Sequence, residues 1–93
     1  MRYVSTRGRA PELGFADVLL AGLAPDGGLY VPVDWPSLPE HLPSGSYQEL
    51  ATVVMAPFVG DDIPADVFAR LVNEAYASFR HEAVTPLRQL AAD

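Results

Sequence analysis

Apolar residues recur at helical spacing in three stretches of the chain. The first lies within residues 14–24, with apolar side chains or glycine at Phe15, Val18, Leu19, Gly22 and Leu23. The second has Tyr47, Leu50, Ala51, Val54, Met55 and Phe58, and the third has Phe68, Leu71, Val72, Ala75, Tyr76 and Phe79. Steps of three and four residues gather such positions on one face of an α-helix, so we predict three amphipathic helices.

Polar residues mark where the second and third helices begin. Ser46 with Glu49 three residues later is a capping box, which predicts a helix from Ser46 to about residue 56. Asp62 is expected to cap the third helix, with Pro64 in its first turn, where the missing N–H costs little.

Prolines mark the expected helix ends. Pro25 should end the first helix, whose first turn carries Asp17, a negative charge that suits the helix dipole. Pro57 should end or kink the second helix in its last turn. From Arg80 onward the pattern becomes irregular.

Two short segments are typical of β-strands. They are Tyr3–Ser5 and Leu29–Val31, and we expect them to pair. The turn signature Pro25-Asp26-Gly27-Gly28 precedes the second segment. Three prolines make residues 33–45 a crossing loop rather than a helix or a central strand: Pro36, Pro39 and Pro43.

Together these elements predict an α+β fold: one small domain over residues 1–93, with three amphipathic helices packed against a short two-stranded β element. A two-stranded sheet is marginal alone, so the helices must cover it.

Composition excludes several classes of protein. The 93 residues include 12 Asp and Glu against 6 Arg and Lys, a net charge of −6. All six cations are arginines, too scattered for the basic patch that nucleic acid needs. The chain has no cysteine and no lysine. It therefore lacks a disulfide framework, a cysteine zinc site, a P-loop and any side chain that forms a Schiff base.

The sequence also gives no sign of a membrane partner. No apolar run reaches the ~18 residues of a membrane helix. Residues 1–5 do not begin a secretory signal. We therefore expect a cytoplasmic protein.

The most suggestive polar cluster is Ser5-Thr6-Arg7-Gly8. Two hydroxyls beside a guanidinium can grip a phosphate or a carboxylate. The same residues also fit a strand end that runs into a turn, with Arg7 at the surface or in an ion pair. The four residues alone do not decide between these interpretations.

Other polar residues are better explained as structural. His41 and His81 have no second histidine at metal-binding spacing, so we expect both to be solvated. Asp61 and Asp62 form a carboxylate pair, but a helix cap accounts for them without a metal. The Asp26-Gly27-Gly28 segment leads into a strand, so no helix N-terminus is available there to receive an anion.

Several blocks, in order along almost the whole chain, resemble the N-terminus of the threonine synthase family: Tyr3–Gly8, Phe15–Pro32, Ile63–Pro64, Tyr76–Arg80 and Val84–Leu87. The most specific block is GLAPDGGL at residues 22–29. Threonine synthases are pyridoxal-phosphate enzymes of the tryptophan-synthase β-chain type. They convert O-phosphohomoserine and water to threonine and phosphate.

The resemblance implies an N-terminal domain whose partners are the catalytic domains of the same polypeptide. The family's cofactor lysine and glycine-rich phosphate loop have no counterpart here, so no residue inherits a catalytic, cofactor-binding or metal role. Ser5, Thr6 and Arg7 are expected near the substrate or at an interdomain contact.

Two alternatives from other classes remain. One is a free-standing interaction module that reuses this fold, and the other is a small hydrolase that acts alone. A reading frame that continues past Asp93 into a lysine-bearing domain would favour the enzyme, and a stop codon there would favour the module.

Overall fold

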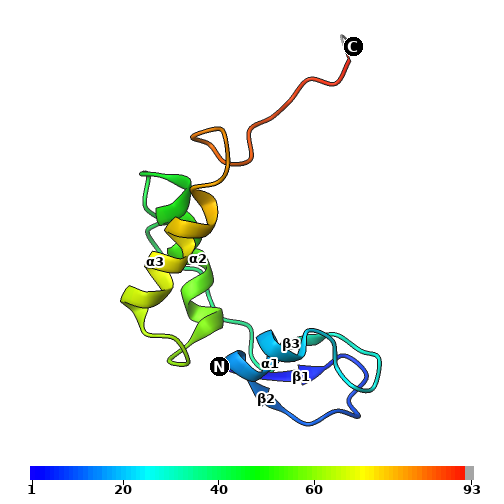
Figure 1. Ribbon diagram of the computed structural model, residues 1–93. Coiled ribbons are helices and arrows are strands. Elements are labelled where there is room, and N and C mark those ends of the chain that lie inside the picture. Colours follow the sequence, from blue (N-terminus) through cyan, green and yellow to red (C-terminus); the bar gives the residue numbers. More distant parts are fainter. Residues whose placement is uncertain (92–93) are drawn as a thin grey trace.

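The sheet and the first helix lie together in one part of the molecule, and the other two helices form a second part (Figure 1). The structure is a computed structural model that describes residues 1–91; residues 92 and 93, the end of the expected domain, lie outside the described residues. In chain order the elements are β1 (Arg2–Ser5), β2 (Leu13–Gly14), α1 (Phe15–Ala21), β3 (Tyr30–Pro32), α2 (Tyr47–Val59) and α3 (Ala65–Tyr76). The expected α+β class is confirmed.

The sheet has three antiparallel strands in the order β2-β1-β3. Both expected strands are present and pair, with Tyr3 opposite Pro32 and Ser5 opposite Tyr30. Tyr3 and Ser5 are buried, because alternate residues of a strand face the same side. The prediction of two strands missed β2, whose two residues are too short to show a period.

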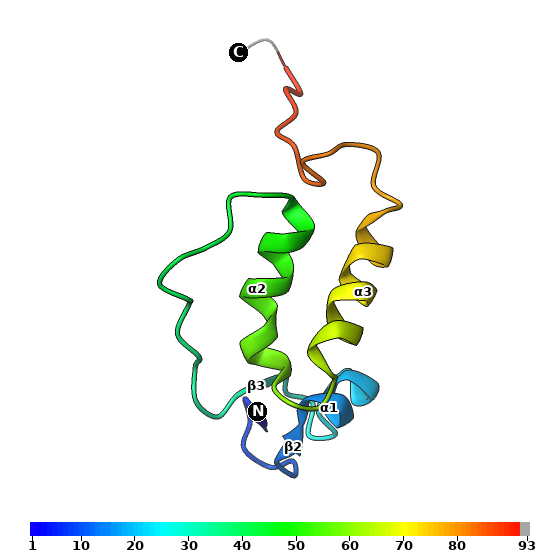
Figure 2. The same ribbon diagram turned by 90° about the vertical axis from the view of Figure 1, so that its left-hand side faces the viewer.

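Helices α2 and α3 form an antiparallel pair (Figure 2). The Tyr47 and Tyr76 rings meet edge to face at 5.1 Å between their centroids. Ser46 caps α2 as expected, since its Oγ accepts a hydrogen bond from the Glu49 N–H at 3.1 Å. Val59 and Val72 are the buried residues of the two helices.

The predicted end of α2 was wrong. Pro57 lies inside the helix, which continues to Val59 and ends at Gly60, where φ is +66°. One proline removes one N–H donor, which shortens the hydrogen-bond ladder but does not stop the last turn. A glycine in the left-handed region ends the helix instead.

Helices α1 and α3 are shorter than predicted. α1 ends at Ala21 rather than near Pro25, because Gly22 has a φ of +73°. α3 ends at Tyr76 rather than near Phe79. Leu71, which the pattern placed on the apolar face of this helix, is 45% exposed.

Asp62 does not cap α3, whose N-cap position is taken by Pro64. Its Oδ2 accepts a hydrogen bond from the Ala16 N–H at 2.8 Å, in the first turn of α1. Asp62 is therefore a capping residue, but the helix that it caps is α1 and not, as predicted, α3. Sequence proximity favoured α3, whereas the fold brings the 60–64 turn against α1.

A narrow seam joins the sheet to the helical pair. The Tyr3 hydroxyl donates a hydrogen bond to the Phe58 carbonyl. The Trp35 ring packs edge to face on the Phe58 ring, with 6.4 Å between the ring centroids. Burial and the nearby charge of Asp62 raise the pKa of Tyr3 above its usual value.

The domain exposes much more surface than its size requires. Its accessible area is 7092 Å², whereas a compact protein of this mass exposes about 5,200 Å². Its radius of gyration is 16.2 Å, against about 12 Å for a compact chain. Val84 is still buried, and Glu82 and Ala83 lie near the start of α2. The segment 87–91 then leads away from the helices, as Figures 1 and 2 show, and Leu87 is fully exposed. Within the described residues, every helix is too short or too polar to span a bilayer.

Candidate functional site

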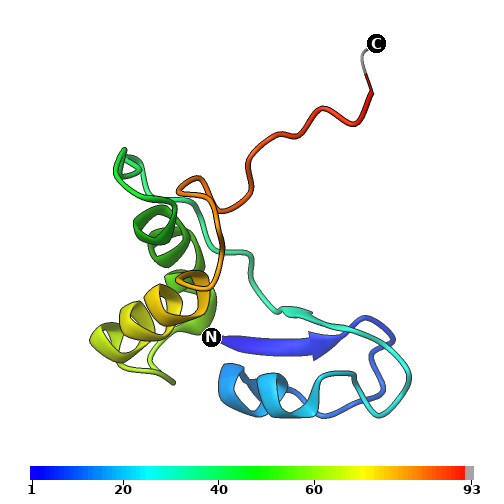
Figure 3. The same ribbon diagram turned by 45° about the horizontal axis from the view of Figure 1, so that its top comes forward.

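The Ser-Thr-Arg segment and the Asp-Gly-Gly turn form one cluster. Both lie at the end of the sheet farthest from α2 and α3, where the loop after β1 meets the loop before β3 (Figure 3). The 24–28 turn is closed by hydrogen bonds from the Ala24 N–H to the Gly28 carbonyl and from the Gly27 N–H to the Ala24 carbonyl.

The Asp26 carboxylate is the centre of this cluster. The Ser5 hydroxyl lies 2.7 and 2.8 Å from its two oxygens. The backbone N–H groups of Arg9 and Gly28 also donate to it, each at 2.9 Å. The Ser5 hydrogen bond, and then the bonds from the two N–H groups, lower the pKa of Asp26 below its usual value of 3.8. The carboxylate therefore stays ionised and holds both loops together.

Thr6 extends the pairing between β1 and β3. Its N–H donates to the Leu29 carbonyl at 2.8 Å, and its Oγ1 accepts from the Leu29 N–H at 3.0 Å. The Ser5 hydroxyl is buried on Asp26. Both hydroxyls are thus engaged in hydrogen bonds within the domain, although Thr6 itself is exposed, and this favours the strand-end interpretation for Ser5 and Thr6.

Arg7 is the member of the segment that faces outward. Its N–H donates to the Ser5 Oγ at 3.1 Å, and Nη1 donates to the Asp26 carbonyl at 3.1 Å. The guanidinium lies against Gly27, where a Cβ atom would come within 2.5 Å of Nη1. Gly27 also has a φ of +86°, which favours glycine.

Gly28 explains why the two motifs occur together. A Cβ atom there would lie 2.5 Å from the Ser5 Oγ and 2.9 Å from the Thr6 Oγ1. The Ser5 and Thr6 hydroxyls thus occupy the space that Gly28, which has no side chain, leaves open. The sequence pattern predicts only a turn at Asp26, and the hydroxyls of Ser5 and Thr6 and the glycines after Asp26 are the signal in the sequence for its larger role.

The histidines and the acidic pair do not form a site. His41 and His81 are exposed, and the His81 Nδ1 accepts a hydrogen bond from the Ala83 N–H at 3.0 Å. Asp61 is exposed beside Asp62. In the described part of the chain, no three His, Cys, Asp or Glu side chains gather in a way that would hold a metal ion.

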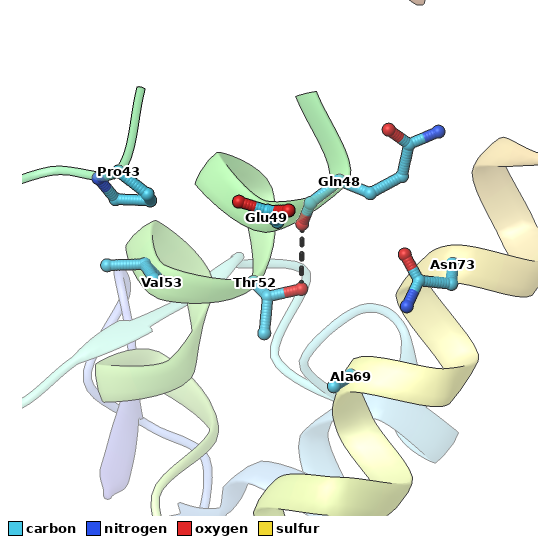
Figure 4. Close-up of a pocket in the computed structure, with 7 residues that line it drawn as sticks. All are labelled: Pro43, Gln48, Glu49, Thr52, Val53, Ala69 and Asn73. Carbon is cyan, nitrogen blue, oxygen red and sulfur yellow. Dashed lines mark hydrogen bonds between the residues drawn. The ribbon is translucent and has the colours of Figure 1, made fainter. Parts of the chain in front are cut away.

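A cavity of about 320 Å³ opens between α2, α3 and the crossing loop (Figure 4). Its lining consists of Pro43, Gln48, Glu49, Thr52, Val53, Ala69 and Asn73. The Thr52 hydroxyl donates to the Gln48 carbonyl of its own helix at 2.8 Å, so it is engaged within the helix. Glu49 is the charged group in the lining and has no base, nucleophile or cation beside it there. The arrangement does not support acid–base or nucleophilic catalysis.

Comparison with known proteins identifies the domain. A family model described as the threonine synthase N terminus matches residues 2–76. The chain belongs to the threonine synthase N-terminal domain family. Threonine synthase from Pseudomonas aeruginosa is 54% identical over 97% of the chain. Threonine synthase-like 2 from Mus musculus is 41% identical, also over 97% of the chain.

The fold of this threonine synthase N-terminal domain also matches a crystal structure. PLP-bound threonine synthase from Brucella melitensis is 55% identical, covers 99% of the chain and superposes with a TM-score of 0.86. The chain spans about a fifth of the length of these relatives, 20% of the Pseudomonas protein and 21% of the Brucella chain. The expected N-terminal domain is confirmed.

Proposed function

We propose that the full-length protein is a threonine synthase that converts O-phosphohomoserine and water to threonine and phosphate, with this chain as its N-terminal domain. The observation that carries the proposal is the identity of 54–55% with two threonine synthases across 97–99% of the chain. The proposal includes a cytoplasmic location, which cell fractionation would test.

In this proposal the pyridoxal phosphate is held outside residues 1–93. The Brucella relative was crystallised with PLP bound. The residues of this chain do not fit that cofactor, because a PLP enzyme binds the aldehyde through a lysine and the sequence has none. In this proposal no chemical step of the reaction depends on a side chain of residues 1–93.

The role that we assign to the domain is docking on the catalytic part of the same polypeptide. Its large exposed area supports this role, as do exposed leucines on and just after α1: Leu19 (63%), Leu20 (87%) and Leu23 (66%). Exposed apolar groups in this number mark surfaces that bind protein. Ser5 and Thr6 then hold the loops of the domain in place through hydrogen bonds, while Arg7 faces the docking partner or the substrate entrance.

Activity measurements test this proposal. The full-length gene product, loaded with pyridoxal phosphate, should release inorganic phosphate from O-phosphohomoserine and form threonine in equal amounts. Residues 1–93 alone should release none. Absence of turnover in a folded, cofactor-loaded full-length protein would contradict the proposal.

The free-standing interaction module is the alternative, and the exposed leucines are compatible with it. The reading frame separates the two, because the module would end near residue 93. If the reading frame continues but the full-length product has no synthase activity, both the synthase function and the free-standing module are excluded.

A further inference from the structure

The Arg7 guanidinium is oriented by the protein but forms no ion pair among the described residues. Its Nη1 donates to the Asp26 backbone carbonyl, a neutral acceptor, at 3.1 Å. A guanidinium has five N–H donors. Among residues 1–91 the ion pair is that of Arg2 with Glu12 at 3.1 Å, and the Arg7 side chain forms none. Arg7 is exposed, so its remaining donors are available to a partner.

A second cation lies in the same loop. The Arg9 side chain is exposed and unpaired among the described residues, while its backbone N–H is held by the Asp26 Oδ2 at 2.9 Å. The Asp26 carboxylate accepts from Ser5, Arg9 and Gly28. It forms no ion pair with either guanidinium group among the described residues, although, besides the Ser5 hydrogen bond, the charge of Arg7 contributes to the lowered pKa of Asp26. A chain with a net charge of −6 thus presents two exposed arginines, two residues apart in sequence, on a loop that hydrogen bonds to Asp26 fix.

Exposed apolar side chains lie near the loop that carries Arg7 and Arg9. Leu29 pairs through its backbone with Thr6 and is 59% exposed; Leu23, which precedes the 24–28 turn, is 66% exposed. Arginine together with apolar groups is enriched where proteins bind proteins. A site for a free phosphate would instead surround the anion with further polar donors.

We propose that Arg7, supported by Arg9 of the same loop, is a preorganised site for a carboxylate of an acidic side chain in the part of the polypeptide that follows this chain. This inference rests on the proposed function, which supplies that partner. Asp26 is the positioning residue, because its hydrogen bonds fix the loop that carries both arginines. The planar fork of a guanidinium matches the two oxygens of a carboxylate.

The absence of lysine allows a direct test. In the full-length protein, Arg7→Lys places the sole side-chain amine of residues 1–93 at this position. A carbodiimide joins an amine to a carboxylate that it already touches. We expect one dominant cross-link from residue 7 to an Asp or Glu beyond residue 93, identified by peptide mapping.

Arg70→Lys is the matched control. Arg70 lies on the exposed side of α3, four residues from Asp66 and from Glu74. Its lysine should cross-link within the helix, which shows that the reagent works, and should give no link beyond residue 93. A comparable link from position 70 to the catalytic part would show that the signal at position 7 is not specific, and would overturn the inference.

Three further results would overturn the proposal. They are no cross-link from residue 7 in a folded protein, a cross-link confined to this domain, and a cross-link that inorganic phosphate suppresses when chloride at equal ionic strength does not. The last result would make a phosphate the occupant. In that case Arg7→Ala should raise KM for O-phosphohomoserine by about 10-fold or more.

Two carboxylate variants test the positioning role of Asp26. Asp26→Asn in the Arg7→Lys background should lower the cross-link yield about 10-fold, because an amide cannot accept all the hydrogen bonds that fix the loop. Asp34→Asn, at an exposed carboxylate of the crossing loop, should leave the yield unchanged. Equal yields in the two variants would remove Asp26 from the inference. Synthase activity of the wild type is measured separately, so failure of the cross-link and failure of the proposed function are distinguishable.

Discussion

The two halves of the domain are stabilised by different kinds of interaction. In the sheet unit, residues 1–33, a buried hydroxyl and an ionised carboxylate join loops that are 21 residues apart in sequence. In the helical hairpin, residues 46–79, the Tyr47 ring of α2 packs on the Tyr76 ring of α3, and the Phe79 ring packs on Tyr76. Hydrogen bonds are directional and apolar packing is not. The sheet unit therefore depends on the positions of single atoms, and the hairpin on the volume of its side chains.

The largest effect is expected in the hairpin. Phe68→Ala should lower the free energy of unfolding by about 3 kcal/mol, since Phe68 is half-buried on the side of α3 that carries the buried Val72. Leu71→Ala should cost only about 1 kcal/mol, because the Leu71 side chain is 45% exposed. Urea unfolding midpoints and slopes would measure both.

Arg70→Ala is the control for that helix, and its cost should stay below about 1 kcal/mol because Arg70 is exposed. A loss at Arg70 or Leu71 larger than that at Phe68 would mean that another face of α3 is packed.

The next effect distinguishes two glycines. Gly28→Ala should cost about 2 kcal/mol, because its Cβ would lie 2.5 Å from the Ser5 Oγ inside the sheet unit. Gly45→Ala should be nearly neutral, although its Cβ also meets a neighbour, since that neighbour is the end of the exposed and flexible Glu49 side chain. Thermal unfolding followed by circular dichroism would compare the two variants. Equal losses of stability would contradict the view that the sheet unit depends on the positions of single atoms.

The helical hairpin could be predicted from the sequence more completely than the sheet unit. The hairpin helices were found because a stripe of apolar residues repeats over a dozen positions. The strand β2 was missed because two residues show no period. The Ser5–Asp26 contact could not be read from spacing, because it depends on how β1 and β3 pair. Asp62 shows the limit most clearly: its chemistry identified a cap, but only the folded chain shows that the cap serves α1.

The seam between the two halves should give a smaller effect. Tyr3→Phe removes the hydroxyl that donates to the Phe58 carbonyl and keeps the ring packed near Phe15. The loss of one such hydrogen bond should cost about 1 kcal/mol. Since the pKa of Tyr3 is raised, the stability it contributes is present below pH 10 and is lost as the pH rises through the higher folded pKa.

Urea midpoints measured from pH 8 to pH 11.5 would test this behaviour. The wild type should lose stability above about pH 10, and Tyr3→Phe should lose less over the same interval. Parallel curves for the two proteins would mean that another group controls the alkaline limb.

The smallest effect is expected at acidic pH and belongs to the sheet unit. The hydrogen bond from Ser5 lowers the pKa of Asp26 from its usual 3.8, so its ionised form stabilises the folded chain above that pH. This contribution is lost as the pH falls below 3.8 and through the folded pKa. Asp26→Asn should therefore be less stable than the wild type at pH 7, with the difference shrinking toward pH 2.

Asp34→Asn is the control for this prediction. It changes an exposed carboxylate of the crossing loop and should show the same stability as the wild type throughout this pH range. Because Asp26 is only partly buried, water screens its charge, and the difference should be smaller than at Phe68 or Gly28. A constant difference between Asp26→Asn and the wild type from pH 7 to pH 2 would show that the carboxylate holds the loops by shape alone.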